Sequence, residues 1–300
     1  MESRISGSWK EVTAQYQAAQ TTVGVPQIEA EGIVTANLLP TVKAVSPLGI
    51  FSVFGHDFSD QTVLHAELDE NGELARILGG TCLEMNGERL PLFAVTPTQI
   101  NAQASATQAL GPASFTVIRD CDAPNTAVSE TIRRELSPRP RAATSGVEIA
   151  TVEKATPGFF LYPPLAEDGF IAARFNSDNA AVVPAGMFTD QFGPSRPAMA
   201  GDIIVLYGTG WGETTADLDS GELATGAAEL LTNANPMVSF GGIFLAPEDV
   251  FYVGVTPQAA GLYQLAIRVP VNGQPGNNQV VLTVYGKSTP LGPVVPVALP

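Results

Sequence analysis

The amino-acid sequence predicts an all-β protein built from two sandwich domains in tandem. Glycine (29 residues) and proline (24 residues) are abundant, while charged residues make up only 15% of the chain, which is typical of many short strands joined by turns. Short apolar runs with partial alternation recur along the chain, and the second half repeats the order of features in the first. A hydrophobic content of 45% in 300 residues is sufficient for two cores.

Residues 1–35 are predicted to form a short polar N-terminal arm. Within it, "SWKEVTAQYQAAQ" suits a short helix, because Trp9, Val12 and Tyr16 fall on one face at helical spacing. Domain 1 is predicted to follow at residues 36–152. It contains strand-like runs such as "GIFSVFGHDF" and "ASFTVI", and "MNGE" is typical of a two-residue hairpin turn.

A linker-like insertion is predicted within domain 1 at residues 126–146, where "RRELSPRPRAATSG" gathers prolines and arginines. Domain 2 is predicted for residues 153–300. Its strand-like runs include "DIIVLYGTG", "GLYQLAIRV" and "NQVVLTVYG".

The two halves match in the order strand, hairpin, Thr-Pro step, strand and Gly-turn. This order indicates an internal duplication of one β-domain. The matched stretches are 46–58 with 198–211, 82–97 with 237–257, 99–105 with 264–270, and 111–117 with 276–282.

The Thr-Pro step is predicted to be a joint of the fold. Pro97 and Pro257 cannot donate to a strand ladder, so each ends a strand or lies at an edge. Gln99 and Gln264 then begin the next strand, where an amide side chain can satisfy a loop backbone group. Additional residues around 259–262 lengthen the loop of the second copy.

Several stretches together resemble a known domain family: "CLEMNGERLPLFAVTPTQINAQ", "ATPGFFLY", "IVLYGTGWGET", "GELATGAAELL" and "LAPEDVFYVGVTPQAAGLYQLAIRVP". They are similar to an uncharacterised C-terminal domain family of large secreted and surface proteins, mainly acidobacterial. That family carries tandem immunoglobulin-like sandwiches of the TIG/IPT type. The resemblance spans roughly residues 36–290. It implies two immunoglobulin-like β-sandwich domains in an extracellular or cell-surface setting, and it implies no established activity.

The charge of the chain restricts its partners. A formal net charge of −15 would repel nucleic acid and anionic membranes, so neither is expected as a partner. No apolar stretch approaches about 18 residues, and none is expected to insert in a membrane. The N-terminus lacks the layout of a signal peptide, so we expect either an intracellular chain or a processed form of a secreted one.

Cys82 and Cys121 are the two cysteines of the chain. Two cysteines are compatible with one disulfide and equally with two free thiols in the core. We favour a disulfide, because the matched positions of domain 2 carry no cysteine. A cysteine pair in one copy of a duplicated domain is more typical of a stabilising cross-link than of a functional site. A disulfide requires an oxidising compartment, in agreement with the secreted setting that the resemblance implies.

No catalytic residues are predicted. "GTGWG" (208–212) follows a strand but precedes turn formers instead of the helix that a dinucleotide site needs, so a turn is expected. His56 and His65 lack the spacings of a zinc site with the cysteines, and no hydrolase motif occurs. A secreted hydrolase, through a Cys–His nucleophile for example, is therefore the least favoured of three functions.

Calcium is the one cofactor for which candidates exist. Asp217, Asp219 and Glu222 gather in "ADLDSGEL", and a second acidic stretch is "ELDENGEL" (67–74). Carboxylates on flexible loops suit Ca²⁺, although neither stretch matches an EF-hand and solvated turns are the more ordinary interpretation.

The leading functional prediction is a non-enzymatic surface, adhesion or assembly module that contacts other protein chains or itself, through sheet faces or strand edges. The alternative is a carbohydrate-binding module for an extracellular polysaccharide. Trp211 is its candidate ligand-contact aromatic, as a residue that caps a loop. The "PGFFLY" stretch, with Phe159, Phe160 and Tyr162, is expected to pack the interdomain junction.

Overall fold

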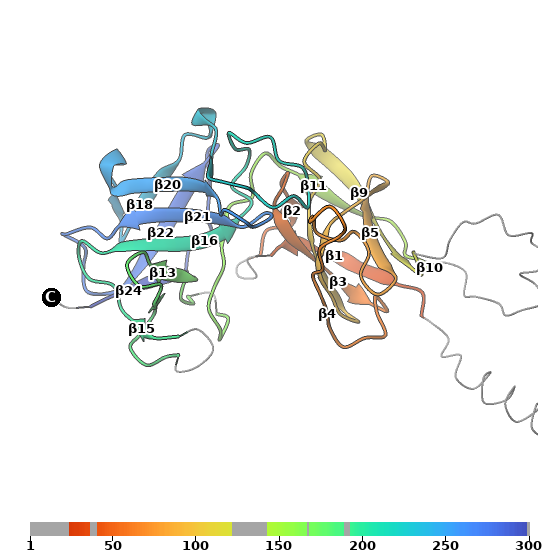
Figure 1. The fold of residues 1–300 in the computed structure, drawn as a ribbon, viewed down its shortest axis with the longest axis horizontal. Coiled ribbons are helices and arrows are strands. Elements are labelled where there is room, and N and C mark those ends of the chain that lie inside the picture. Colours follow the sequence, from red (N-terminus) through yellow and green to blue (C-terminus); the bar gives the residue numbers. More distant parts are fainter. Residues whose placement is uncertain (1–23, 37–40, 122–142, 167, 189–192, 299–300) are drawn as a thin grey trace, which may run out of the picture.

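The computed structural model describes residues 24–36, 41–121, 143–166, 168–188 and 193–298. Over these residues the fold is all-β, with two sandwiches in tandem and only two short 3-10 turns (Figure 1). No helix within the described ranges is both long and apolar enough to span a bilayer.

Domain 1 consists of two facing sheets (Figure 1). The strand order is β1-β3-β8-β7-β4 in one sheet and β2-β11-β9-β5-β6 in the other, with β10 beside β9. The strands are β1 (Gln27–Thr35), β2 (Ala44–Val45), β3 (Ile50–His56), β4 (Leu64–His65), β5 (Thr81–Met85), β6 (Glu88–Arg89), β7 (Leu92–Val95), β8 (Gln99–Gln103), β9 (Gly111–Arg119), β10 (Ala143–Thr144) and β11 (Glu148–Val152).

Domain 2 repeats this plan with additional strands at one side. One sheet has the order β15-β14-β13-β16-β21-β20-β17, with β12 beside β16, and the other has the order β19-β18-β22-β23, with β24 beside β22. The elements are β12 (Gly158–Phe159), β13 (Ala173–Phe175), β14 (Ala181–Val182), β15 (Ser195–Arg196), β16 (Ile203–Thr209), β17 (Ala228–Glu229), η1 (Thr232–Ala234), β18 (Met237–Phe240), β19 (Ile243–Phe244), η2 (Pro247–Asp249), β20 (Val250–Val255), β21 (Tyr263–Arg268), β22 (Gly276–Val284), β23 (Lys287–Ser288) and β24 (Val294–Val297).

Alternation of side chains explains how the strands build the two cores. Successive side chains of a strand point to opposite faces, so every second residue enters the sandwich. In β9 and β22 the burial pattern alternates in this way over most of the strand. One core contains buried residues between Ile33 and Val152, and the other contains residues between Ala155 and Val297.

The pairing of the strands reproduces the duplication. The hairpin β5–β6 pairs with β9 as the hairpin β18–β19 pairs with β22, and β4-β7-β8-β3 follows the same order as β17-β20-β21-β16. Asn86–Gly87 and Gly241–Gly242 turn the two hairpins with positive φ at both positions, as a type I′ turn requires. The hairpin match made from the sequence is therefore confirmed.

One sequence prediction needs correction, and two others fall mainly on residues that the structure does not describe. Residues 27–35 of the predicted arm form β1, which pairs with β3, because "QIEAEGIVT" ends in apolar residues that enter the core of domain 1. The helix predicted around Trp9 and most of the 126–146 insertion lie outside the described residues.

Gln99 and Gln264 are equivalent in the sheets, because Gln99 stands opposite Phe54 and Gln264 stands opposite Tyr207, but the loops before them differ. The N–H of Thr96 donates to the Gln99 carbonyl, whereas the N–H of Thr256 donates to that of Leu262. The second loop is therefore three residues longer. The bulges of the two ladders align Val95 and Ile100 with Val253 and Leu265, and the ladder of domain 2 continues two pairs further, to Val255 and Tyr263.

Candidate functional site

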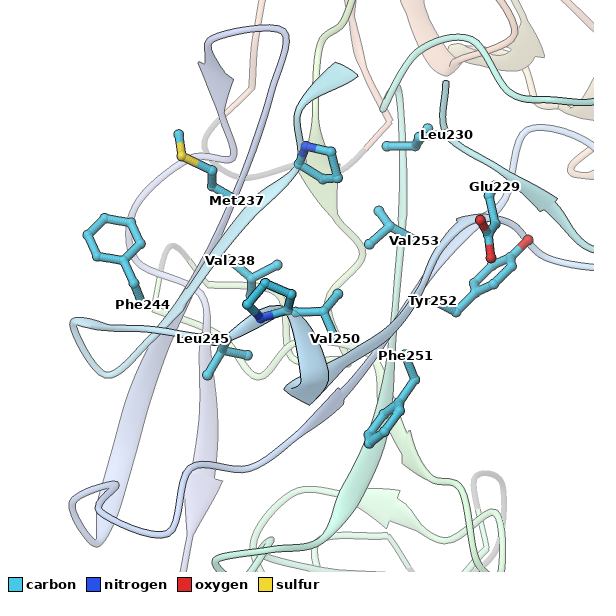
Figure 2. Close-up of a pocket in the computed structure, with 12 residues that line it drawn as sticks. Glu229, Leu230, Met237, Val238, Phe244, Leu245, Val250, Phe251, Tyr252 and Val253 are labelled. Carbon is cyan, nitrogen blue, oxygen red and sulfur yellow. The ribbon is translucent and has the colours of Figure 1, made fainter. Parts of the chain in front are cut away.

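An apolar groove lies along one edge of the domain 2 sandwich. It has a volume of about 560 Å³. Strand β18 and the hairpin to β19 form one wall, and η2 with the first half of β20 forms the other. In Figure 2, Val238, Leu245 and Val250 lie between Phe244 on one side and Phe251 and Tyr252 on the other.

Three large apolar side chains of this groove are exposed to solvent. Phe244 is 75% exposed, Met237 47% and Phe251 44%. Exposing large apolar side chains together costs hydrophobic free energy, which is recovered when a partner covers them. The sequence pattern alone did not predict these residues as a site. The signal was present, because the matched hairpin turns place Phe244 where domain 1 has Arg89.

The polar groups at the groove are few and largely satisfied. The Tyr252 hydroxyl donates to the Val255 carbonyl (2.7 Å) and accepts from the Ala228 N–H (3.0 Å), and burial raises the pKa of this hydroxyl. The Arg268 guanidinium lies 5.2 Å from the centre of the Phe251 ring and donates to Asp249 (3.1 Å). Glu229 lies at the end of the groove beside Tyr252 (Figure 2). The site is thus suited to apolar groups more than to polar ones.

The equivalent edge of domain 1 is closed. Hydrogen bonds that are the same in both hairpins, Leu90 N–H to Leu83 O and Leu245 N–H to Val238 O, fix the equivalence. Leu83 and Leu90 are 0% exposed, whereas Leu245 is only partly buried. The residues between β4 and β5 (66–80) number fifteen, whereas only seven (230–236) join β17 to β18. Domain 2 therefore lacks the covering loop.

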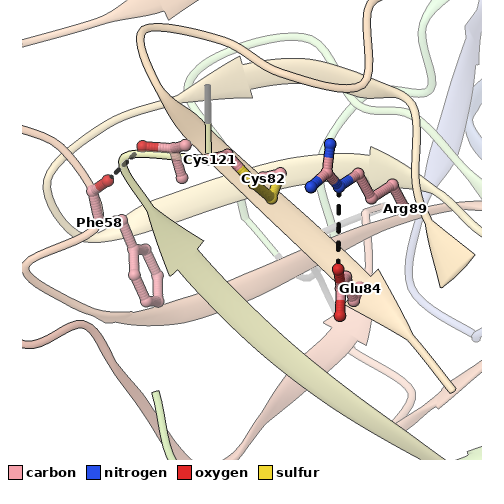
Figure 3. Close-up of a disulfide and its surroundings, with 6 residues drawn as sticks. Phe58, Cys82, Glu84, Arg89 and Cys121 are labelled. Carbon is pink, nitrogen blue, oxygen red and sulfur yellow. Dashed lines mark hydrogen bonds and ion pairs between the residues drawn. A yellow bond between two sulfur atoms is a disulfide. The ribbon is translucent and has the colours of Figure 1, made fainter. Parts of the chain in front are cut away.

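A disulfide also covers the closed edge. Cys82 and Cys121 are bonded, with their Cα atoms 6.1 Å apart, and Figure 3 shows the bond beside the Arg89–Glu84 ion pair. Both cysteines of the chain are in this bond, so neither is a free nucleophile for the hydrolase alternative. The residue equivalent to Cys82 in domain 2 is Met237, which lines the groove.

Trp211 is wrongly predicted as a ligand contact. It is 0% exposed and packs between the rings of Phe159 (5.8 Å between centres) and Tyr263 (5.6 Å) in the core of domain 2. Its indole N–H donates to the Gly158 carbonyl. Phe159 likewise packs in this core instead of at the interdomain junction.

The two predicted acidic loops meet at the junction between the domains. The Leu74 N–H donates to the Gly221 carbonyl (2.9 Å), and the Gly221 N–H donates to the buried Gln103 side chain (2.7 Å). The Arg76 guanidinium donates to the Ser220 carbonyl (2.8 Å). These contacts hold the loops by their backbones, so their shape serves the packing of the two domains.

The calcium prediction finds no geometric support. Within the described ranges no group of three or more His, Cys, Asp or Glu side chains is arranged to hold a metal ion. Glu222 accepts a hydrogen bond from the backbone N–H of Asp219 (3.0 Å), and none of Asp217, Asp219 and Glu222 belongs to a metal-binding group among the described residues. In the other loop, backbone N–H groups of Glu73 and Asn71 lower the pKa of Asp69.

His56 and His65 also do not form a site. Both are exposed on domain 1, and His56 Nδ1 lies 3.0 Å from Asp57 Oδ2. The "GTGWG" stretch is a turn after β16, with positive φ at Gly210 and Gly212.

Comparison with known protein sequences does not identify a family for this chain. No protein-family profile matches the chain, and no curated protein sequence matches it. The resemblance to the acidobacterial domain family therefore stays a prediction.

Among solved structures the likeness is distant. The glucan-utilisation protein SGBP-B of Bacteroides ovatus, solved with a mixed-linkage heptasaccharide, has a TM-score of 0.30 at 9% identity, with 85% of this chain and 44% of that chain covered. The extracellular region of plexin A4 has a TM-score of 0.25 at 11% identity, covering 91% and 18%. A tandem pair of titin immunoglobulin domains has a TM-score of 0.24 at 12% identity, covering 86% and 92%. The chain spans less than half of the first structure, and at these TM-scores the likeness carries no argument about function.

Proposed function

We propose that this chain is a non-enzymatic, extracytoplasmic module that binds other protein chains through the groove of domain 2. The observation that carries the proposal is the opened sandwich edge with Phe244, Met237 and Phe251 exposed along it. Interfaces concentrate aromatic residues and Met at their cores, and the groove has this composition.

The disulfide supports the proposed extracytoplasmic location. A structural disulfide between Cys82 and Cys121 persists in oxidising compartments, such as the extracellular space, and is rare in the cytosol. The acidic surface agrees with partners other than nucleic acid and membrane.

The groove favours a protein over a polysaccharide as ligand. A bound sugar ring presents hydroxyl groups that lose free energy when they are buried without partners. The groove offers mainly aliphatic and aromatic carbon, and the Tyr252 hydroxyl is already bonded on both sides. Trp211, the residue on which the carbohydrate alternative depended, is inside the core.

Site-specific photo-crosslinking tests the proposal. A benzoylphenylalanine replaces Phe244 in one protein and Ile149, which is 59% exposed on β11 of domain 1, in a control protein. Each is irradiated with extracellular material of the producing organism. We expect a discrete protein adduct from position 244 alone, competed by the native chain and not by Phe244→Arg. The absence of such an adduct, with saturable polysaccharide binding that Phe244→Arg abolishes, would reject the proposal in favour of carbohydrate binding.

A further inference from the structure

The proposed function leaves the chemistry of the partner open, and the inference here rests on that function. We infer that the groove takes an extended aliphatic segment of a partner protein, which covers the domain 2 edge as residues 75–78 cover the equivalent edge of domain 1. Domain 2 thus has the uncovered edge, and domain 1 of the same chain shows what kind of segment covers the equivalent edge.

In domain 1, the covering segment has defined contacts. Leu78 is 2% exposed and belongs to the core cluster that contains Leu83, Leu90 and Leu92. The Leu92 N–H donates to the Ala75 carbonyl (3.0 Å), so the segment also bonds to the backbone of β7. The Arg76 side chain donates to the Arg89 carbonyl.

The equivalents of these contacted residues line the groove in domain 2. The sheet register places Val238 at the position of Leu83, Leu245 at that of Leu90 and Val250 at that of Leu92. All three line the groove. Phe244 takes the place of Arg89. The position that carries an exposed arginine in domain 1 therefore carries an exposed aromatic ring in domain 2. The equivalent surface is therefore covered in domain 1 and left uncovered in domain 2.

The backbone at the groove is also available for pairing. Strand β20 pairs with β21 on one side along most of its length, but its pairing with β17 includes only Val255 and Gly254. Beyond these, the Leu230 N–H donates to the Val253 carbonyl. Within the described residues no strand pairs with Val250–Tyr252 on that outer side. An unpaired strand edge accepts an added extended segment, whose alternate side chains enter the adjacent pocket.

The groove has dimensions suited to such a segment. Its volume of about 560 Å³ lies within the range of roughly 300–1,000 Å³ that is usual for ligand pockets. The occupant that fits is an extended stretch with one or two aliphatic side chains directed between the sheets. It would also have small residues where the backbone approaches β20, as Ala75 does beside β7.

The covering segment itself supplies the probe. A synthetic peptide of residues 72–80, "GELARILGG", contains one acidic and one basic residue and has no net side-chain charge. It is titrated into the full native chain carrying ¹³C-methyl methionine. Met237 reports on the groove, and Met199, which is 52% exposed elsewhere in domain 2, is an internal control of similar exposure.

We expect a saturable shift of the Met237 methyl signal and none of Met199. Phe244→Arg, which copies the residue of domain 1 at an exposed position, should weaken binding at least about tenfold, the effect of losing about 1.4 kcal/mol at an interface anchor. A peptide with Leu78→Ser should bind at least as poorly, and Ile149→Ser in the protein should change nothing.

Two results would overturn the inference. One is the absence of a saturable Met237 shift at millimolar peptide, and the other is a shift that Phe244→Arg leaves unchanged. If the crosslinked adduct at position 244 still forms, the proposed function stands and the groove takes a segment of different chemistry. If the adduct is also absent, both the inference and the proposed function fail.

Discussion

The two domains share their strand order but close the same edge of the sandwich in different ways. In domain 1, fifteen residues join β4 to β5, and they bury Leu78 against Leu83 and Leu90. In domain 2, seven residues join β17 to β18 and leave that edge open. The framework is common to both domains, and the difference lies in loop length.

A second loop changes in the opposite direction. One residue separates Leu90 from Leu92 in domain 1, whereas four separate the equivalent Leu245 and Val250. These four residues include η2, and its Pro247 lines the groove. Domain 2 therefore lacks the covering loop of domain 1 and has an additional turn in the groove wall.

Removing the disulfide is expected to have the largest effect on this comparison. Cys82→Ala with Cys121→Ala should lower the free energy of unfolding of domain 1 by roughly 4 kcal/mol, because the bridge closes a loop of about 40 residues in the unfolded chain. Urea denaturation, compared between the native chain and the double variant, measures this loss.

Domain 2 provides the control for that experiment. In a Trp9→Phe background, Trp211 fluorescence follows the unfolding of domain 2, because Trp211 lies in its core. We expect its urea transition to stay unchanged in the double variant. An equal loss in both domains would show that the bridge acts on the whole chain and not on the closed edge alone.

Matched leucine truncations test the difference between the closed and open edges directly. Leu90→Ala removes a fully buried side chain and should cost about 3 kcal/mol in the free energy of unfolding, whereas Leu245→Ala removes a partly exposed one and should cost about 1 kcal/mol. Urea midpoints at equal m-values give both numbers. Equal costs would mean that the groove is as well packed as the edge of domain 1.

The strand pattern and the duplication were predictable from the sequence because both are local. Alternation in "SFTVI" and the Asn86–Gly87 turn depend on residues a few positions apart, and the structure confirms both. The Thr-Pro step was also found, and the strand that follows it was matched in the correct register. Only the backbone hydrogen bonds of Thr96 and Thr256 reveal the three additional residues.

The groove and the burial of Trp211 depend on residues far apart in the sequence. Trp211 follows a turn, so local pattern suggests an exposed position, but Phe159 and Tyr263 enclose it from about 50 residues away on either side. The groove exists because the covering loop is shorter in domain 2 than in domain 1. This difference in length can be recognised only after the equivalent strands of the two domains are known. Phe244 in the place of Arg89 was the one signal available from the matched hairpins.

A smaller effect is expected at the junction between the two domains. Gln103 is buried and joins the domains, because its amide N–H donates to the Leu48 carbonyl (3.0 Å) while its amide oxygen accepts from Gly221. Gln103→Ala leaves a buried carbonyl and a buried N–H without this partner and should cost about 1–3 kcal/mol. Differential scanning calorimetry should show the transition of domain 1, which contains Gln103 in β8, at a lower temperature than in the native chain. Gln99→Ala, whose amide bonds only to Ser52 and Asn101 within domain 1, is the matched control.

The smallest expected effect is that alkaline pH lowers the stability of domain 2 more than that of domain 1. Five of the six tyrosines lie in domain 2, and none lies between residues 36 and 152. Burial raises the pKa of the Tyr263 hydroxyl, which donates to the Gly212 carbonyl (2.6 Å). The unfolded chain ionises near pH 10, so this contribution to stability is complete below about pH 10 and is lost above it while folded Tyr263 stays protonated.

The expected loss for Tyr263 is about 1.4 kcal/mol per pH unit above pH 10, and it should appear in the unfolding transition of domain 2 and not in that of domain 1. Tyr263→Phe removes the titrating group and should flatten the pH dependence of domain 2 between pH 10 and 11.5 by that amount. Urea midpoints at half-unit pH steps measure both slopes. A slope that Tyr263→Phe leaves unchanged would assign the alkaline sensitivity to Tyr162, Tyr252 and Tyr285, for which burial also raises the pKa.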